Sequence, residues 1–362
     1  MTTVEEIRAS LQGVMDPELG RNIVELGMVR DIRLSDGRAE VTLALTTMAC
    51  PLKGKIIGNV ESAIRTLDSG LSVEVKPVEM SDEERGKVFG QRVPERGTAE
   101  PFNKIHRVIA VVSGKGGVGK SSVAALLAVA LRKQGQRVGL LDADVTGPSI
   151  PRMFGLQTPP KVTPMGLMPV VSAGGIKVMS VNLLLSHEDT PVVWRGALIS
   201  GLIRQFWGDV LWEELDTLII DLPPGTSDAT LTVMQSIPVS AVLLVTSPQD
   251  LAGMVVRKAA QMARQLSIPI VGLIENMSYV LCPDCGRRID VFGPSRAEAT
   301  AQTLGIPLLG RIALDAGLAF SADEGVIESY PADAFAPIAE AVSAAVAAVV
   351  AAHPTVAASG AK

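Results

Sequence analysis

Residues 108–122 read Val108-Ile109-Ala110-Val111-Val112-Ser113-Gly114-Lys115-Gly116-Gly117-Val118-Gly119-Lys120-Ser121-Ser122. An apolar, β-rich run enters a glycine-rich turn, and apolar residues at helical spacing follow the turn. The turn satisfies the pattern G-x-x-x-x-G-K-[ST] in the strand-to-helix setting that this pattern requires. Backbone N–H groups of such a turn converge on phosphate oxygens, and the helix dipole adds to the attraction. The stretch therefore predicts a nucleoside triphosphate site.

Several residues of this turn can be given roles. We expect Lys120 to reach the β- and γ-phosphates and the Ser121 hydroxyl to bind Mg²⁺. Lys115 follows the first glycine and is not needed for phosphate binding in its own subunit. It is either a solvated loop lysine or a cation that serves the nucleotide of another subunit. The expected nucleotide-binding residues of the turn are Gly114, Lys115, Gly116, Gly117, Val118, Gly119, Lys120, Ser121 and Ser122.

Two later apolar runs end in acidic residues. Residues 138–144 end at Asp144, and the run that begins at Leu218 ends at Asp221 and is followed by a Pro-Pro-Gly turn. Carboxylates at the C-terminal ends of parallel strands lie where α/β sheets bind ligands. Asp221 fits the Walker B role of holding Mg²⁺, and Asp144 is placed to orient the attacking water. Either acid alone could instead be a helix cap.

Further apolar runs alternate with helical stretches along the chain. This alternation predicts an α/β protein, a P-loop NTPase with a mostly parallel, doubly wound sheet. The additional strands are expected at residues 176–181, 241–246, 270–276 and 308–312. The alanine- and valine-rich run at 338–352 is expected to be a helix that packs against this sheet. It has no Lys or Arg, which argues against a basic amphipathic membrane helix.

Two of the three cysteines, Cys282 and Cys285, lie at C-x-x-C spacing. Two such thiolates can hold one edge of a metal site, whereas zinc and iron–sulfur sites normally take four protein ligands. A dimer would supply four thiolates at the subunit interface. The alternatives are a redox dithiol and two ordinary cysteines in a turn.

Four segments, in order along the chain, resemble the Mrp/ApbC-type iron–sulfur cluster carriers, which belong to the deviant Walker A ATPases. They are Asp142–Pro151, Val193–Gly196, Asp221–Asp228 and Glu275–Ser278, the last just before the cysteine pair. The resemblance implies an ATPase that delivers clusters to apo-proteins, with assembly scaffolds as further partners. It also implies a homodimer in which Lys115 reaches across to the second subunit.

The same resemblance suggests site residues. A [4Fe–4S] cluster would bridge Cys282 and Cys285 of both subunits, and Asn276 would recognise adenine. The implied cofactors are ATP, Mg²⁺ and the cluster. The implied catalytic residues are Lys115, Lys120, Asp144 and Asp221. Two other readings stay open: a partition- or positioning-type ATPase switch, and a targeting chaperone ATPase whose C-x-x-C holds interfacial zinc.

Residues 1–79 are expected to form a separate small α/β domain, with a hairpin around residues 35–37. Segments 16–20 and 46–52 resemble the SufT/PaaD-like domain of metal–sulfur assembly factors. Cys50 precedes a proline at an expected helix start, and is either a transient cluster contact or an inert thiol. The chain then divides into a mobile linker at 80–104, the ATPase domain at 105–352 and a disordered tail at 353–362.

Composition excludes several classes of function. The net charge is −5 and aromatic residues make up 3%, which argues against a nucleic-acid partner. No segment reaches the roughly 20 apolar residues of a membrane span, and the first residues do not resemble a signal peptide. Few cysteines and no targeting segment favour a reducing, cytoplasmic location and no membrane partner.

Overall fold

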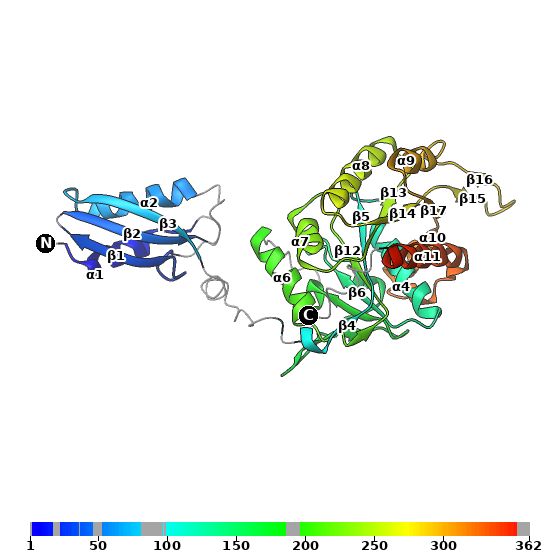
Figure 1. The fold of residues 1–362 in the computed structure, drawn as a ribbon, viewed down its shortest axis with the longest axis horizontal. Coiled ribbons are helices and arrows are strands. Elements are labelled where there is room, and N and C mark those ends of the chain that lie inside the picture. The colour runs from blue at the N-terminus through cyan, green and yellow to red at the C-terminus, as the bar shows by residue number, and fades with distance from the viewer. Residues whose placement is uncertain are drawn as a thin grey trace. The chain divides into compact units, whose positions relative to one another are not determined.

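The computed structural model describes residues 2–16, 22–35, 37–45, 53–80, 97, 99–185 and 196–352. The chain divides into two compact units, Met1–Glu95 and Arg96–Lys362 (Figure 1). Each unit has hydrophobic core residues of its own. The expected tail at 353–362, most of the expected linker, Cys50 and Val193–Arg195 lie outside the described residues.

In its described residues, the first unit has a three-stranded sheet packed against two helices. Its sheet has the order β1-β2-β3, with β1 and β2 antiparallel and β2 and β3 parallel. The elements are α1 (Val4–Ser10), β1 (Val29–Ser35), β2 (Arg38–Leu45), α2 (Lys53–Leu67) and β3 (Ser72–Glu79). A capping box between Thr3 and Glu6 starts α1, which continues as a 3₁₀ turn at Leu11–Gly13. The expected hairpin at residues 35–37 is confirmed by the antiparallel pairing of β1 and β2.

The second unit is built on an eight-stranded sheet of order β17-β14-β13-β5-β12-β6-β10-β9. Neighbouring strands are parallel except β9, which is antiparallel to β10. The strands are β5 (Val108–Ser113), β6 (Val138–Asp142), β9 (Val170–Val171), β10 (Lys177–Ser180), β12 (Thr217–Asp221), β13 (Ala241–Thr246), β14 (Ile270–Glu275) and β17 (Leu308–Arg311). The predicted mostly parallel, doubly wound sheet is confirmed.

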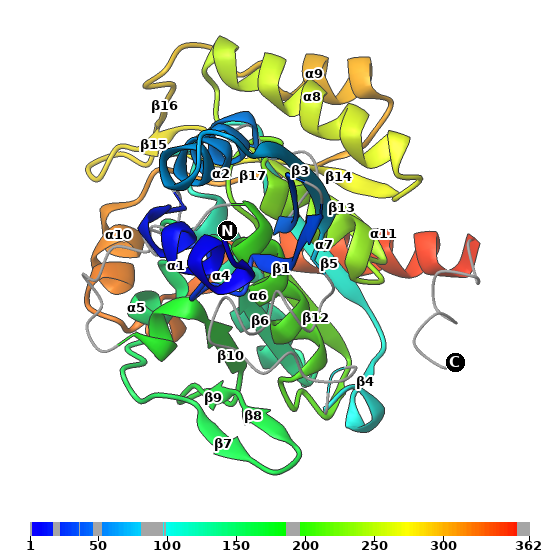
Figure 2. The same cartoon turned by 90° about the vertical axis from the view of Figure 1, so that its left-hand side faces the viewer.

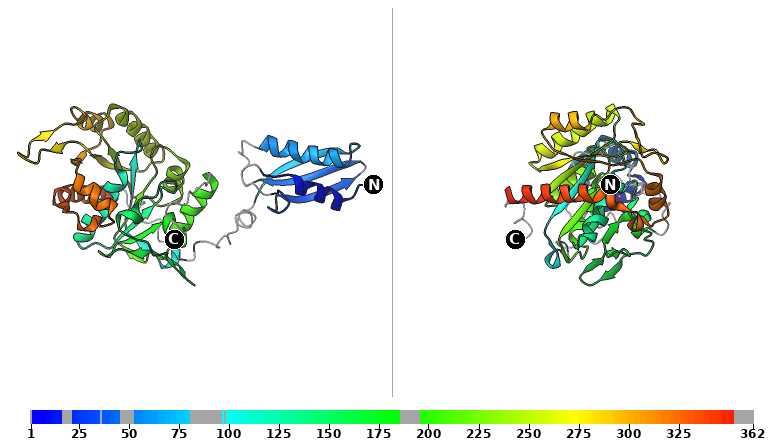
Figure 3. Two further views of the ribbon diagram at one scale, coloured as in Figure 1. Left: turned by 180° about the vertical axis from the view of Figure 1, so that it is seen from behind. Right: turned by 90° about the vertical axis from the view of Figure 1, so that its right-hand side faces the viewer.

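Helices cover both faces of this sheet, and a separate apolar core fills each interface (Figure 2). One face carries α4 (Lys120–Lys133), α5 (Ile150–Met153), α10 (Ala316–Asp323) and α11 (Ala336–Ala352). The other carries α6 (Gly196–Gly208), α7 (Asp228–Ser236), α8 (Asp250–Gln265) and α9 (Ala297–Leu304). In α11, Val342 and Val346 are buried in the core, so the predicted C-terminal helix packs as expected (Figure 3). Among the described residues, no helix is long and apolar enough to cross a membrane.

The end of the expected linker at 80–104 belongs instead to the second unit, so the sequence boundary is placed too late. Ala99 is fully buried, and its N–H donates to the carbonyl of Gly208. A 3₁₀ turn (Glu100–Phe102) and strand β4 (Lys104–Ile105) follow, and β4 pairs with β11 (Glu214–Leu215). The boundary differs because β4 pairs with β11, a segment over a hundred residues away in the sequence. Such a long-range pairing leaves no local pattern from which it could be predicted.

The remaining elements are short. Outside the large sheet, the described part of the second unit has two antiparallel hairpins. They are β7 (Lys161–Thr163) with β8 (Gly166–Met168), and β15 (Val280–Leu281) with β16 (Arg288–Ile289). The β15–β16 hairpin projects away from the sheet (Figures 1 and 3). Further 3₁₀ turns are Val181–Leu184, Ile327–Ser329 and Ala332–Phe335.

Candidate functional site

The glycine-rich loop connects β5 to α4 at the C-terminal edge of the sheet. Gly117 and Gly119 have φ angles of 79° and 74°, a left-handed conformation that favours glycine. Gly114 packs so tightly on α8 that a Cβ there would overlap the backbone of Val255 and Val256. The loop therefore needs glycine for its backbone shape and for its packing against α8.

Lys120, Ser121 and Asp221 meet directly beneath the loop. Lys120 Nζ lies 2.5 Å from Asp221 Oδ1, and Ser121 Oγ donates to Asp221 Oδ2 at 2.6 Å. Lys120 is 6% exposed and Asp221 is fully buried. Burial raises the pKa of Asp221 above its usual value, whereas the charge of Lys120 opposes this shift. A hydroxyl and a carboxylate side by side are oxygen donors of the kind that Mg²⁺ prefers, so these residues fit the ion.

Asp142 is a buried carboxylate to which the sequence reasoning gave no role. It lies next to Asp221 in the parallel register of β6 and β12, and it is fully buried. Its carboxylate accepts hydrogen bonds from the backbone N–H groups of Ser149 and Ile150 and from Ser180 Oγ. Burial, followed by the charge of Asp221, raises the pKa of Asp142 to about 8. Its position as the last residue of an apolar strand is the sequence feature that could have identified it as a site residue.

Asp144 follows β6 and organises the loop after this strand. Its Oδ1 accepts hydrogen bonds from Thr146 Oγ1 at 3.1 Å and from the Gly147 N–H at 3.3 Å. Its own N–H donates to Asp142 Oδ1 at 3.2 Å. The side chain is half-buried and reaches the same edge of the sheet as Asp221. Its action on an attacking water stays a prediction.

Lys115 lies at the surface of the loop, away from the buried pair. Its Nζ donates to Gln249 Oε1 at 3.2 Å, and the lysine is exposed. An exposed lysine at this position is accessible from outside the subunit. The predicted action on a second subunit's nucleotide therefore stays open.

Asn276 follows β14 and contacts the loop directly. Its Nδ2 donates to the carbonyl of Val118 at 2.9 Å, and the residue is 3% exposed. A Cβ on Gly119 would overlap this nitrogen, so the two residues are in close contact. The amide thus braces the loop from the end of β14, which is separated from β5 by β13 in the sheet. Its recognition of adenine stays a prediction.

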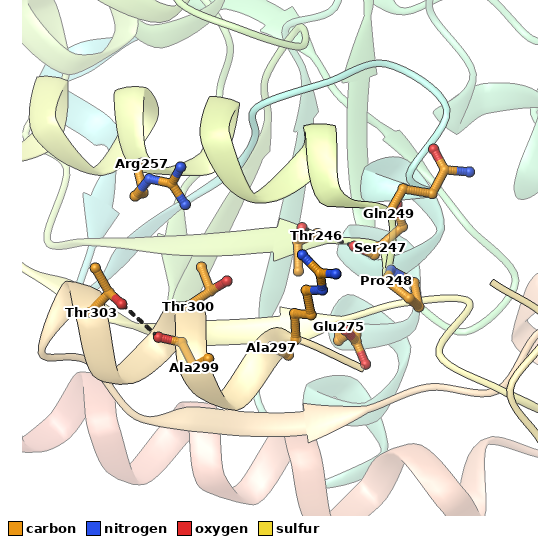
Figure 4. A pocket seen from close by; sticks show the side chains of 11 residues that line it. Thr246, Ser247, Pro248, Gln249, Arg257, Glu275, Ala297, Ala299, Thr300 and Thr303 are labelled. Carbon is orange, nitrogen blue, oxygen red and sulfur yellow. Dashed lines mark hydrogen bonds between the residues drawn. The ribbon is translucent and has the colours of Figure 1, made fainter. Parts of the chain in front are cut away.

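A cavity of about 390 Å³ lies on the face of the sheet that carries α8 and α9, and residues of these two helices and the ends of β13 and β14 line it. Gln249 and Glu275 lie toward one end, and Thr300 and Thr303 line the other (Figure 4). Gln249 also contacts Lys115, so the cavity borders the loop rather than containing it.

Cys282 and Cys285 lie in the turn of the β15–β16 hairpin. The turn is closed by hydrogen bonds from the Cys282 N–H to Arg287 O and from the Gly286 N–H to Cys282 O, both at 2.9 Å. Hydrogen bonds from the backbone N–H groups of Asp284 and Cys285 lower the pKa of the Cys282 thiol. Cys285 is exposed and Cys282 is partly exposed. The turn thus favours a thiolate that is accessible from outside.

This hairpin lacks a complete ligand set of its own. Within the described ranges, no group of three or more His, Cys, Asp or Glu side chains is placed to hold a metal. Large apolar side chains around the turn are 40–51% exposed: Leu281, Ile289, Val291, Phe292 and Leu314. An apolar rim around two accessible thiols is suited to contact with another protein.

Two protein families match the chain. Residues 104–350 match the family of NUBPL iron-transfer P-loop NTPases, and residues 4–76 match a family of iron–sulfur cluster assembly proteins.

Curated relatives and a solved structure agree with these matches. An iron–sulfur cluster carrier protein of Synechocystis sp. is 41% identical over 344 residues, which is 93% of this chain and 94% of the relative. A protein of the same description from Methanocaldococcus jannaschii is 49% identical over 229 residues, 63% of this chain and 79% of the relative. A nucleotide-binding protein from Archaeoglobus fulgidus, solved in complex with ADP, is 47% identical with a TM-score of 0.59. That alignment covers 66% of this chain and 94% of the other.

Proposed function

The chain belongs to the family of NUBPL iron-transfer P-loop NTPases, and from this premise we propose that it is an ATPase that carries iron–sulfur clusters and transfers them to apo-proteins. The observation that carries the proposal is the exposed hairpin with Cys282 and Cys285 on the same unit as a complete phosphate loop. The thiols serve the cargo, and the loop binds the nucleotide.

The cargo is a [4Fe–4S] cluster held between two copies of the chain. Each hairpin offers two thiols, while such a cluster takes four protein ligands. The lowered pKa of Cys282 favours the thiolate that binds iron. The apolar rim around the turn supplies surface for contact with a second copy or with an acceptor.

ATP binds at the loop and is hydrolysed slowly. Lys120 would exchange its pairing with Asp221 for the β- and γ-phosphates, and Ser121 and Asp221 would hold Mg²⁺. The ion, when bound, neutralises charge on the phosphate oxygens. Asp144 orients water, Asn276 contacts the base, and Lys115 reaches the nucleotide of the second subunit.

The first unit recognises acceptor proteins or assembly scaffolds. Its match to iron–sulfur cluster assembly proteins supports this role. Cys50 contributes at most a transient contact, and the cluster is held by the second unit.

The deciding experiment is anaerobic purification followed by visible absorption and analysis of iron, sulfide and zinc. A brown protein with iron and sulfide, and dimers by light scattering, is the expected result. Zinc at one ion per dimer without sulfide would instead support the zinc-bridged chaperone, which the same cysteine pair would serve. A colourless, metal-free protein that still hydrolyses ATP would support a positioning-type switch.

A further inference from the structure

Only five residues, 277–281, separate Asn276, which braces the phosphate loop, from Cys282. We infer that residues 275–279 transmit the state of the phosphate loop to the cysteine turn within one subunit, with Met277 as the positioning residue. The inference rests on the proposed function, because it presupposes that nucleotide and cluster bind at these two places. It adds a route that does not pass through the subunit interface.

The segment touches the phosphate loop at Asn276. The amide nitrogen donates to Val118 O at 2.9 Å and fills the space in which a Cβ of Gly119 would lie. Gly119 directly precedes Lys120, which must leave Asp221 to reach a phosphate. A shift of the loop on binding phosphate therefore displaces the Asn276 side chain, because closely packed groups cannot absorb it.

Met277 holds a strained backbone conformation. Its φ is 55°, in the left-handed region, where among the described non-glycine residues only Glu213 and Ser267 also lie. Its terminal methyl lies beside Gly119, so it also faces the loop. Non-glycine residues persist in this region only when their surroundings enforce it, and they cluster at switch regions. Met277 is thus a stiff bend rather than a flexible joint.

The residues on either side of the bend are tied to Ile312, the residue that follows β17. Ser278 Oγ donates to Glu275 Oε2 at 2.5 Å, and Glu275 is 1% exposed. The Ser278 N–H donates to Ile312 O at 2.8 Å, and the Ile312 N–H donates to Glu275 O at 2.9 Å. With both sides tied together and the bend at Met277 stiff, residues 275–279 respond to a displacement of Asn276 as one unit.

This movement of residues 275–279 reaches the cysteine turn over a short distance. The guanidinium of Arg288 lies 4.4 Å from the ring centre of Tyr279, and Arg288 pairs with Leu281 across the hairpin. No glycine occurs from Glu275 to Cys285, so the connection has no intrinsically flexible residue. The six steps from Asn276 to Cys282 span at most about 20 Å of chain.

The test compares three variants of the full-length chain. Met277→Gly removes the stiffness and the strain, whereas Met277→Leu keeps both. Ser267→Gly is the matched control, because it relieves the same left-handed conformation after α8, outside the segment. Each protein is reconstituted anaerobically with iron and sulfide. Cluster transfer to an apo-ferredoxin of the [4Fe–4S] type is then followed with and without Mg-ATP.

The readout is the ratio of the two transfer rates, together with the Kd of a non-hydrolysable ATP analogue in the apo and cluster-loaded proteins. Linkage requires the two sites to affect each other's affinity by the same factor. We expect Met277→Gly to bring the rate ratio and the ratio of Kd values to unity. Its cluster content, ATP hydrolysis and nucleotide-free transfer should equal those of the wild type. Met277→Leu and Ser267→Gly should keep the wild-type ratios.

Two results would overturn the inference. One is an unchanged rate ratio in Met277→Gly, which would leave the proposed carrier function intact and place the coupling at the subunit interface. The other is loss of cluster content or ATP hydrolysis in this variant, which would make Met277 a purely structural residue. If the wild type itself shows no effect of Mg-ATP on transfer, the failure lies in the proposed nucleotide-coupled function instead.

Discussion

At the scale of single residues, the two lysines of the phosphate loop differ in burial, and this difference predicts separable effects. Lys120→Ala leaves Asp221 buried without its cationic partner, so we expect lost ATP hydrolysis and about 3 kcal/mol lower unfolding free energy. Lys115 is exposed, and its Nζ donates to the Gln249 side-chain amide oxygen at the surface. Lys115→Ala should therefore change stability by less than about 0.5 kcal/mol while impairing hydrolysis.

Urea unfolding and a phosphate-release assay measure the two effects on the same preparations. Equal destabilisation by both substitutions would contradict the assignment of Lys120 to a buried ion pair. Wild-type turnover by Lys115→Ala would make that lysine an ordinary surface residue.

Asp142 predicts a pH dependence of stability. Burial raises its folded-state pKa from 3.8 to about 8, so between these values the folded chain keeps a proton that the unfolded chain has released. This proton stabilises the fold at low pH, and the contribution is lost as pH rises toward 8, with a slope of up to about 1.4 kcal/mol per pH unit. Asp142→Asn does not titrate and should lose this slope.

The measurement is urea unfolding of both proteins at several pH values from about 5 to 8. The difference between the two pH profiles isolates Asp142, because other titrating groups are common to both chains. Parallel profiles would show that Asp142 is ionised in the folded protein across this range.

At the scale of elements, the β15–β16 hairpin predicts which cysteines hold the cluster. Cys282→Ala or Cys285→Ala should each abolish bound iron and acid-labile sulfide, because either change removes two of four ligands from a symmetric dimer. Cys50→Ala is the matched control and should keep both. Iron and sulfide assays after anaerobic reconstitution decide the matter, and full retention in either hairpin variant would exclude the bridging arrangement.

Elements with a local pattern could be predicted from the sequence, and contacts between distant residues could not. The apolar run at 241–246 matches β13 to the residue, and the runs at 270–276 and 308–312 overrun β14 and β17 by one residue each. The hydrogen bond from Asn276 to Val118 joins positions 158 residues apart, and the pairing of β4 with β11 is similarly distant. Neither leaves a periodic trace, because each depends on how strands are ordered in the sheets.

At the scale of the whole molecule, both candidate sites belong to the second unit. The phosphate loop and the cysteine hairpin follow β5 and β14, two strands of one sheet. The first unit has hydrophobic core residues of its own, so its folding is expected to rely on its own contacts. The residues that we propose to bind the nucleotide and the cluster therefore all lie in the second unit.

The proposed dimer predicts that two inactive variants restore ATP hydrolysis when they are combined in one heterodimer. If Lys115 serves the partner's nucleotide while Asp144 serves its own, neither Lys115→Ala nor Asp144→Ala homodimers hydrolyse ATP. Mixing the two variants creates heterodimers in which one site has an intact Asp144 and receives an intact Lys115 from the other subunit. Random exchange makes half of the dimers mixed, each with one of two sites complete, so about a quarter of wild-type ATPase activity should return.

The mixture is allowed to exchange subunits before phosphate release is measured, and each variant alone serves as control. Heterodimer formation is verified by two different affinity tags, so that absence of activity cannot reflect absence of exchange. If Lys115 acts within its own subunit, one site of every mixed dimer lacks the lysine and the other lacks the aspartate. Verified heterodimers without restored hydrolysis would then exclude action across the interface, because both sites would be incomplete in every species present.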